Sequence, residues 1–125
     1  MERKAIADEL SPKWPYQEEY DFSSEDWFTR NIPIWEVALA SYKGRLDIHY
    51  LEIGAFEGRS GMWMLDNILT HPSSRMTVID PFYRFRGRDI EPVFSANLQK
   101  KRWRLRRMSL PTTISCSMTR PSHPS

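Results

Sequence analysis

Residues Tyr50–Leu65, which read YLEIGAFEGRSGMWML, decide the fold of this 125-residue chain. An apolar run from about Ile48 to Ile53 predicts a buried strand, and apolar residues resume at helical spacing from about Ser60. A turn that begins at Gly54 and ends at Gly58 joins the two. A strand, a glycine turn and a helix in this order are typical of doubly wound α/β proteins. Because three residues separate these glycines, the dinucleotide fingerprint G-x-G-x-x-G is absent.

The neighbouring segments extend this unit in both directions. Apolar residues at helical spacing predict a helix over residues 31–42, before the strand, and the helix that follows the glycine turn should reach about residue 70. A second short strand is expected over residues 75–79, parallel to the first because a helix connects them. A third helix should begin near Asp89 or Pro92 and lose its apolar pattern after Leu98.

Size and composition indicate one modest globular domain. The hydrophobic content is 40%, with five Trp, five Tyr and six Phe, which favours a packed core over a disordered chain. Cys116 is the only cysteine, so no disulfide can form within the chain. The N-terminus lacks the apolar stretch of a secretory signal, and no apolar run approaches the roughly 20 residues that span a bilayer. We therefore expect a cytoplasmic protein with no membrane partner.

Charge divides the chain into two unequal parts. Residues 1–80 carry 8 Lys/Arg against 14 Asp/Glu, a net charge of −6, whereas residues 81–125 carry 10 against 2, a net charge of +8. Six of the basic residues fall within positions 100–107. Of the 18 residues from 108 to 125, 11 are Ser, Thr or Pro and none is acidic, which predicts disorder.

Three features together resemble motif I of a known enzyme family. Glu52, Gly54 and Gly58 form the pattern Glu-x-Gly-x-x-x-Gly after the first strand, and Asp80 closes the second strand 22 residues after Gly58. This arrangement resembles the class I S-adenosylmethionine-dependent methyltransferases over roughly residues 25–98. The resemblance implies a Rossmann-like fold, S-adenosyl-L-methionine as the cofactor and methyl transfer as the reaction.

The resemblance also implies a role for each site residue. Asp80 should bind the adenosyl ribose, since a carboxylate accepts well from two vicinal hydroxyls. The glycine turn should pass under the methionyl part, Glu52 should face the cationic end of the cofactor, and Ser60 should cap the following helix. Glu57 and Arg59 are expected to be solvated loop charges. The residues assigned to the cofactor are Glu52, Gly54, Ala55, Phe56, Gly58, Ser60, Asp80 and Pro81.

The chain departs from this family after Leu98. A complete family member has a seven-stranded sheet, but only its first two strands are recognisable here. We therefore expect an incomplete doubly wound Rossmann-like sheet with N-terminal helices and a disordered C-terminal tail. The expected divisions are a helical lead-in over residues 1–46, the cofactor-binding half over 47–98, and a basic, then Ser/Thr/Pro-rich tail over 99–125. The swing in composition also suggests that residues from about Gln99 onward are foreign to the fold, as in a truncated or frameshifted chain.

Catalytic residues and the methyl acceptor stay unassigned. His49, His71 and His123 have no neighbour in the sequence that suggests general-base or metal chemistry, so no metal site is expected. The missing acceptor-binding elements also leave open whether this chain turns over. Short sheets expose their edges, which favours self-association.

Two other functions compete with methyl transfer. The basic segment over residues 100–107 flanks Trp103 and could bind nucleic acid, because Lys and Arg neutralise phosphates and an aromatic ring stacks on bases. No recognised nucleic-acid-binding motif accompanies it. A nicotinamide-dependent enzyme is the third reading, disfavoured by the absence of G-x-G-x-x-G.

Overall fold

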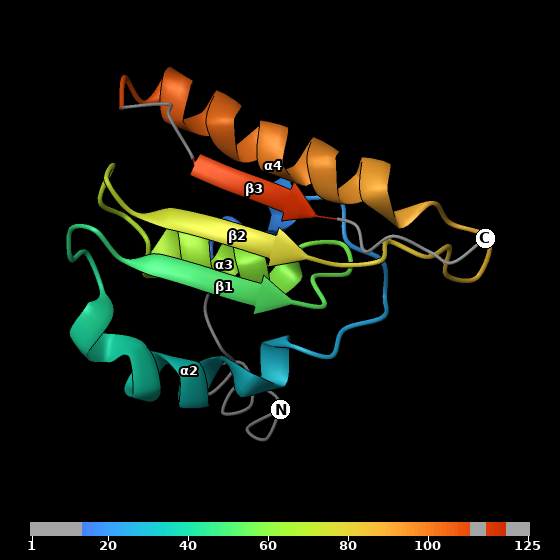
Figure 1. Ribbon diagram of the computed structural model, residues 1–125, viewed down its shortest axis with the longest axis horizontal. Coiled ribbons are helices and arrows are strands. Elements are labelled where there is room, and N and C mark those ends of the chain that lie inside the picture. The colour runs from blue at the N-terminus through green and yellow to red at the C-terminus, as the bar shows by residue number, and fades with distance from the viewer. Residues whose placement is uncertain (1–13, 111–114, 120–125) are drawn as a thin grey trace, which may run out of the picture.

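The computed structural model describes residues 14–110 and 115–119. A parallel sheet lies at its centre, flanked by helices of different lengths (Figure 1). The elements in chain order are η1 (Gln17–Glu19), η2 (Thr29–Asn31), α2 (Ile32–Leu39), η3 (Ala40–Tyr42), β1 (His49–Ile53), α3 (Arg59–Asn67), β2 (Arg75–Ile79), α4 (Ile90–Arg107) and β3 (Ser115–Thr119).

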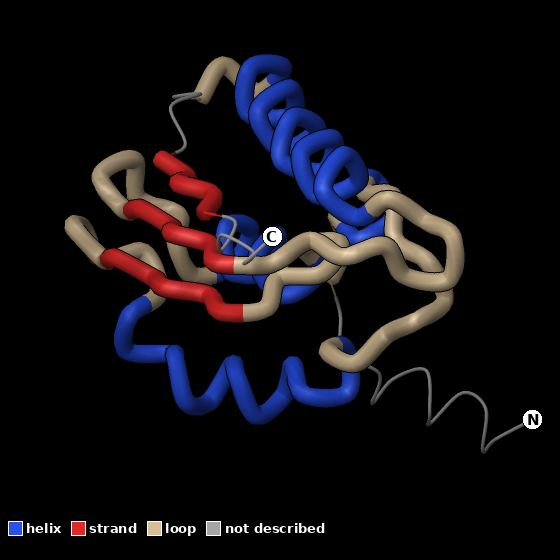
Figure 2. Tube along the Cα trace, turned by 45° about the vertical axis from the view of Figure 1, so that its right-hand side comes forward, coloured by secondary structure: helices blue, strands red, loops and turns tan. Residues whose placement is uncertain are grey.

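The sheet confirms the expected parallel α/β architecture. Its strand order is β1-β2-β3, with His49 opposite Arg75 in the first pair and Arg75 opposite Ser115 in the second. Helices α3 and α4 provide the two crossovers that parallel neighbours require. In the views of Figures 1 and 2, α2 lies on the β1 side of the sheet and α4 on the β3 side.

Helix α3 supplies much of the core. It ends at Asn67, before the expected residue 70. Six apolar positions in α3 and just after it are all buried, so this segment packs on more than one side. Met76 and Val78 of β2 are buried as well, whereas the alternate residues Leu51 and Ile53 of β1 are exposed. The six buried positions are Met62, Trp63, Met64, Leu65, Ile68 and Leu69.

Asp66 contradicts the amphipathic pattern of α3, which directs it to solvent. Its side chain is 1% exposed and lies between the N-terminal segment and α4. Lys101 Nζ lies 2.8 Å from Asp66 Oδ1, and the Arg104 guanidinium also binds this oxygen. Trp14 donates its indole N–H to Oδ2 at 2.9 Å, and the Tyr20 hydroxyl lies 3.0 Å from both oxygens. These five side chains form the Asp66 cluster.

The Asp66 cluster gives the uneven charge of the chain a structural cause. Arg104 also pairs with Glu19 at 2.9 Å, and Arg88 pairs with Asp21 at 3.0 Å. Most ion pairs between described residues thus join an acidic residue before position 81 to a basic one after it. The two parts of the chain attract each other in the folded state.

The prediction of a disordered C-terminal tail is wrong for two segments. Helix α4 continues without a break to Arg107, because Lys101 and Arg104 turn inward and bind acidic side chains. Residues 99–107 therefore belong to the fold, and α4 crosses the expected boundary at residue 98. Residues 115–119 form β3, a third strand that the sequence did not predict. The other residues of the predicted tail beyond Leu110 lie outside the described part of the chain.

No helix among the described residues is both long and apolar enough to cross a bilayer.

Candidate functional site

A pocket of about 350 Å³ opens at the C-terminal end of β1. One wall is the glycine loop, with Gly54 and Phe56, and the other is the segment that precedes and begins α2, with Trp27 and Trp35. Glu52 lies at the base of the pocket. Parallel α/β sheets bind their ligands at the carboxyl ends of strands, which is where this pocket lies.

Glu52 is the most unusual group of the pocket. It is 6% exposed; the Ser60 hydroxyl donates to its Oε1, while Oε2 has no hydrogen-bond partner. Burial raises the pKa of this carboxyl to about 7, against the opposing hydrogen bond from Ser60 and with a small contribution from Asp80. A carboxylate that stays buried with an unpaired oxygen is costly, and such groups concentrate at functional sites.

Gly61 makes room for this carboxylate. It was not among the site residues predicted from the sequence. A Cβ at this position would lie 2.9 Å from Glu52 Oε2 and 3.4 Å from Met76 Sδ. A glycine inside the predicted helix could have indicated this role, because a glycine destabilises a helix and is kept there where close packing needs it.

Ser60 does not cap α3, contrary to the sequence prediction. The N-cap residue is Gly58, and no side chain caps this helix. The hydroxyl of Ser60, the second residue of α3, binds Glu52 instead. A buried carboxylate competes effectively for a nearby hydroxyl because a bond to a charged acceptor is about twice as strong as a neutral one.

Asp80 holds the glycine loop against the end of β2. Its Oδ2 accepts from the backbone N–H groups of Ala55 at 2.6 Å and Phe56 at 3.1 Å, and its Oδ1 accepts from Phe82 N–H at 2.6 Å. Phe56 has a φ of 52°, a left-handed conformation that few non-glycine residues adopt, and the bond to Asp80 fixes it. Asp80 is buried and does not line the pocket, and Pro81 does not line it either.

The structure therefore brings together part of the predicted cofactor set. Asp80 and Gly58 support the loop from behind, without touching the pocket. The predicted residues that line the pocket are Glu52, Gly54, Ala55, Phe56 and Ser60.

Gly58 allows a sensitive test of the loop. It has a φ of +93°, and a Cβ there would lie 2.9 Å from Cδ2 of the buried Phe94. We expect Gly58→Ala to lower the free energy of unfolding by about 2 kcal/mol, through the left-handed backbone and the clash with the ring. Chemical denaturation measures the loss. Gly87→Ala is the matched control, because its φ of +81° imposes similar strain with nothing within 4 Å of the added Cβ. Equal losses in the two variants would mean that the Phe94 contact is unimportant.

Arg59 and Glu57 are not the solvated loop charges that the sequence predicted. The Arg59 guanidinium donates to Ser23 C=O at 2.8 Å, pairs with Asp26 at 3.5 Å and lies 4.5 Å from the centre of the Phe22 ring. Glu57 is 1% exposed. Both residues bind the N-terminal segment, a long-range contact that no local pattern indicates.

Trp27 lines the pocket and belongs to a group of three aromatic rings. Trp27 is 53% exposed, and its ring lies 4.9 Å from that of Phe56 and 5.7 Å from that of Phe85. Phe28, Trp35 and Tyr50 add further aromatic surface to the lining. Glu25 is already paired with Arg86, and Arg59 with Asp26, so the Glu52 carboxyl group and the aromatic faces of the lining favour a cation that also carries apolar groups.

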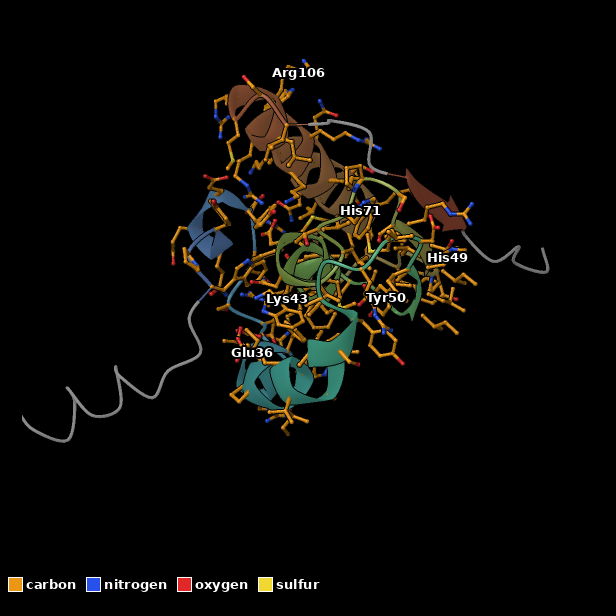
Figure 3. The ribbon with its side chains drawn as sticks, turned by 90° about the vertical axis from the view of Figure 1, so that its left-hand side faces the viewer. Glu36, Lys43, His49, Tyr50, His71 and Arg106 are labelled. Atoms are coloured by element: carbon orange, nitrogen blue, oxygen red, sulfur yellow. The ribbon has the colours of Figure 1, made fainter. Side chains whose placement is uncertain are left out.

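The two histidines in the described part of the chain do not line this pocket. Figure 3 shows His49 and His71 in separate places, on β1 and in the loop after α3. His49 Nε2 lies 2.8 Å from Thr77 Oγ1, and His71 Nδ1 lies 2.7 Å from Ser73 Oγ. Over the residues that the structure describes, no cluster of His, Cys, Asp and Glu could hold a metal ion. His123 lies outside the described residues.

The basic segment of α4 does not present one continuous positive surface. Lys101 and Arg104 point into the Asp66 cluster, and Arg107 lies 4.0 Å from Glu19. Trp103 is half-exposed and borders a shallow depression with Lys100, Arg107 and Glu19. The inward-facing charges are thus unavailable to phosphates.

Comparison with known proteins found no matching family model, no matching curated protein and no matching solved structure. Membership of the methyltransferase family therefore stays a prediction from the motif.

Proposed function

We propose that this chain binds S-adenosyl-L-methionine in the pocket at the end of β1, as a class I methyltransferase with an incomplete Rossmann-like sheet. The observation that carries the proposal is the buried carboxyl group of Glu52, a residue of the aromatic-lined pocket, with one oxygen that has no hydrogen-bond partner. S-Adenosylmethionine has a sulfonium cation, an ammonium group and apolar parts. A carboxylate and aromatic faces attract such a cation, and its charge would compensate that of Glu52.

The strand order agrees with this proposal. The sequence β1-β2-β3 with helical crossovers corresponds to one half of the doubly wound order 3-2-1-4-5-6. In such sheets the loop after the first strand approaches the ligand, as the pocket-lining Gly54 and Ala55 can do here. The N-terminus of α3 follows directly and would favour the carboxylate of the methionyl group.

Asp80 serves the proposal by holding the loop and not by direct contact with the cofactor. Its carboxylate accepts from the backbone N–H groups of Ala55, Phe56 and Phe82, and it does not line the pocket. The cofactor supplies the methyl group that an acceptor nucleophile takes, while the residues of this chain bind and orient it.

Isothermal titration calorimetry tests the proposal directly. We expect saturable binding of S-adenosylmethionine with a Kd in the range of about 1 μM to 1 mM, and no binding of NAD. S-Adenosylhomocysteine, which lacks the sulfonium charge, should bind more weakly if Glu52 recognises the cation. Absence of heat from S-adenosylmethionine at millimolar concentration would refute the proposal.

Nucleic-acid binding is the second candidate, supported by the exposed ring of Trp103 between Lys100 and Arg107. Glu19 in the same depression opposes it. Filter binding with single-stranded RNA at two salt concentrations separates the candidates, since phosphate contacts weaken with added salt.

A further inference from the structure

Glu57 is a buried residue whose side chain and backbone together contact three separate segments of the chain. Its Oε1 accepts from the backbone N–H of Ser23 at 3.0 Å and from the Ser23 hydroxyl at 2.9 Å. Its Oε2 lies 2.9 Å from Arg88 Nε, in an ion pair without an aligned hydrogen bond. Burial to 1% exposure makes these contacts strong, since little water competes for the charge.

The backbone of Glu57 is held as firmly as its side chain. Its C=O accepts from Asn97 Nδ2 of α4 at 2.9 Å. The same amide group of Asn97 donates to Asp21 C=O at 3.1 Å, and Asn97 Oδ1 accepts from Asp21 N–H at 2.7 Å. Residues 21–23 are therefore joined to the glycine loop through both Glu57 and Asn97.

This connection links the two walls of the pocket. The glycine loop forms one wall, and Glu57 is the residue before Gly58 at the end of that loop. The opposite wall begins at Glu25 and Trp27, only two and four residues after Ser23. Because Glu57 holds Ser23, it sets how closely the two walls approach each other, although it does not line the pocket itself.

We infer that Glu57 is a positioning residue for the ligand of this pocket. It closes the wall around Trp27 against the glycine loop, and Arg88 fixes its carboxylate from the loop that follows β2. The identity of the ligand rests on the proposed function, whereas the position of the wall does not. A surface loop charge, as the sequence predicted, could not act in this way.

The variant Glu57→Gln tests this inference with little change in size. Glutamine keeps an oxygen that can accept from Ser23 but directs an amide N–H₂ at Arg88, donor against donor. We expect the affinity for S-adenosylmethionine to fall by about tenfold, as loss of a buried charged partner predicts. The double variant Glu57→Gln, Arg88→Gln pairs two neutral amides and should recover part of that affinity.

A second measurement separates positioning from general loss of stability. Fluorine NMR of the protein labelled with fluorotryptophan reports on Trp27 without any ligand. In Glu57→Gln, and more weakly in Ser23→Ala, we expect the Trp27 resonance to move toward its solvent-exposed position while that of Trp103 stays in place. Ile68→Val, which trims the core beneath α3, is the matched control for destabilisation and should move neither resonance.

The outcomes distinguish this inference from the proposed function. An unmoved Trp27 resonance in Glu57→Gln, or the same change in Ile68→Val, overturns the positioning role. Absence of S-adenosylmethionine binding by the unmodified protein refutes the proposed function, and the Trp27 resonance then still decides whether Glu57 holds the wall.

Discussion

We expect Asp66→Asn to lower the free energy of unfolding by about 3–5 kcal/mol, the largest loss of the variants considered. Asparagine keeps the shape of the side chain but removes the charge that Lys101 and Arg104 share. Both cations are largely buried, so they cannot recover their lost interaction from water. Tyr20 keeps a neutral hydroxyl in this cluster, because burial, reinforced by Asp66, raises its pKa far above the ordinary value. Urea denaturation at pH 7 measures the loss.

An exposed ion pair provides the matched control for Asp66. Asp89 lies 3.1 Å from Arg84, but their side chains are 66% and 69% exposed. Asp89→Asn should therefore change the free energy of unfolding by less than about 0.5 kcal/mol. Similar losses in the two variants would show that burial of the Asp66 cluster contributes little.

The second large effect concerns Glu52, whose replacement should raise the free energy of unfolding instead of lowering it. Its folded pKa of about 7 lies above the ordinary value of 4.5, so the folded state binds the proton more tightly than the unfolded state. The contribution of the protonated carboxyl to stability is complete below pH 4.5 and is lost as the pH rises through 7. The loss amounts to about 3 kcal/mol at alkaline pH.

Glu52→Gln removes this loss, because an amide does not ionise. We expect the variant to be more stable than the unmodified protein by about 2 kcal/mol at pH 8. This is the gain of about 3 kcal/mol reduced by about 1 kcal/mol, the cost of a buried N–H₂ group without an acceptor. At pH 4.5 the advantage should disappear. Urea denaturation at both pH values tests this, and an equal difference at the two would exclude titration of Glu52 as the cause.

The same variant should bind the proposed ligand with lower affinity. Without the ionised carboxylate, Glu52→Gln should bind S-adenosylmethionine at least tenfold more weakly at pH 8, and its affinity should not change through pH 7. In the unmodified protein the affinity should rise as the pH rises through 7, since Glu52 then ionises. A residue that lowers stability and strengthens binding is typical of a functional site. Glu36→Gln, an exposed substitution on α2, controls for the change in net charge (Figure 3).

The central unit could be predicted because its signals are local. An apolar run, two glycines and a helical repeat lie within a few residues of one another. These signals predicted β1, α3 and the pocket-lining position of Glu52. The parallel pairing with β2 followed from the connecting helix alone. Strand β3 could not be found this way, because SCSMT has no apolar run.

The remaining errors concern polar residues whose partners are distant in the chain. Asp66 looks like a solvent-facing residue of an amphipathic helix until Arg104, 38 residues later, is placed beside it. Glu57 looks like a loop charge for the same reason, since Ser23 precedes it by 34 residues. Helical spacing describes which residues share a face, and it contains no information about a cation that another element brings to that face.

The Asp66 cluster also imposes a sequence of events on a nascent chain. Tyr20 and Arg104, which bind each other at 3.0 Å, are separated by 84 residues. At about 5–20 residues per second, a ribosome adds Arg104 roughly 4–17 s after Tyr20. Asp66 follows Tyr20 by 46 residues and precedes Arg104 by 38, so for roughly 2–8 s after its own synthesis it lacks this cation. The cluster that joins the N-terminal aromatic residues to α4 can therefore be completed only after α4 has been synthesised.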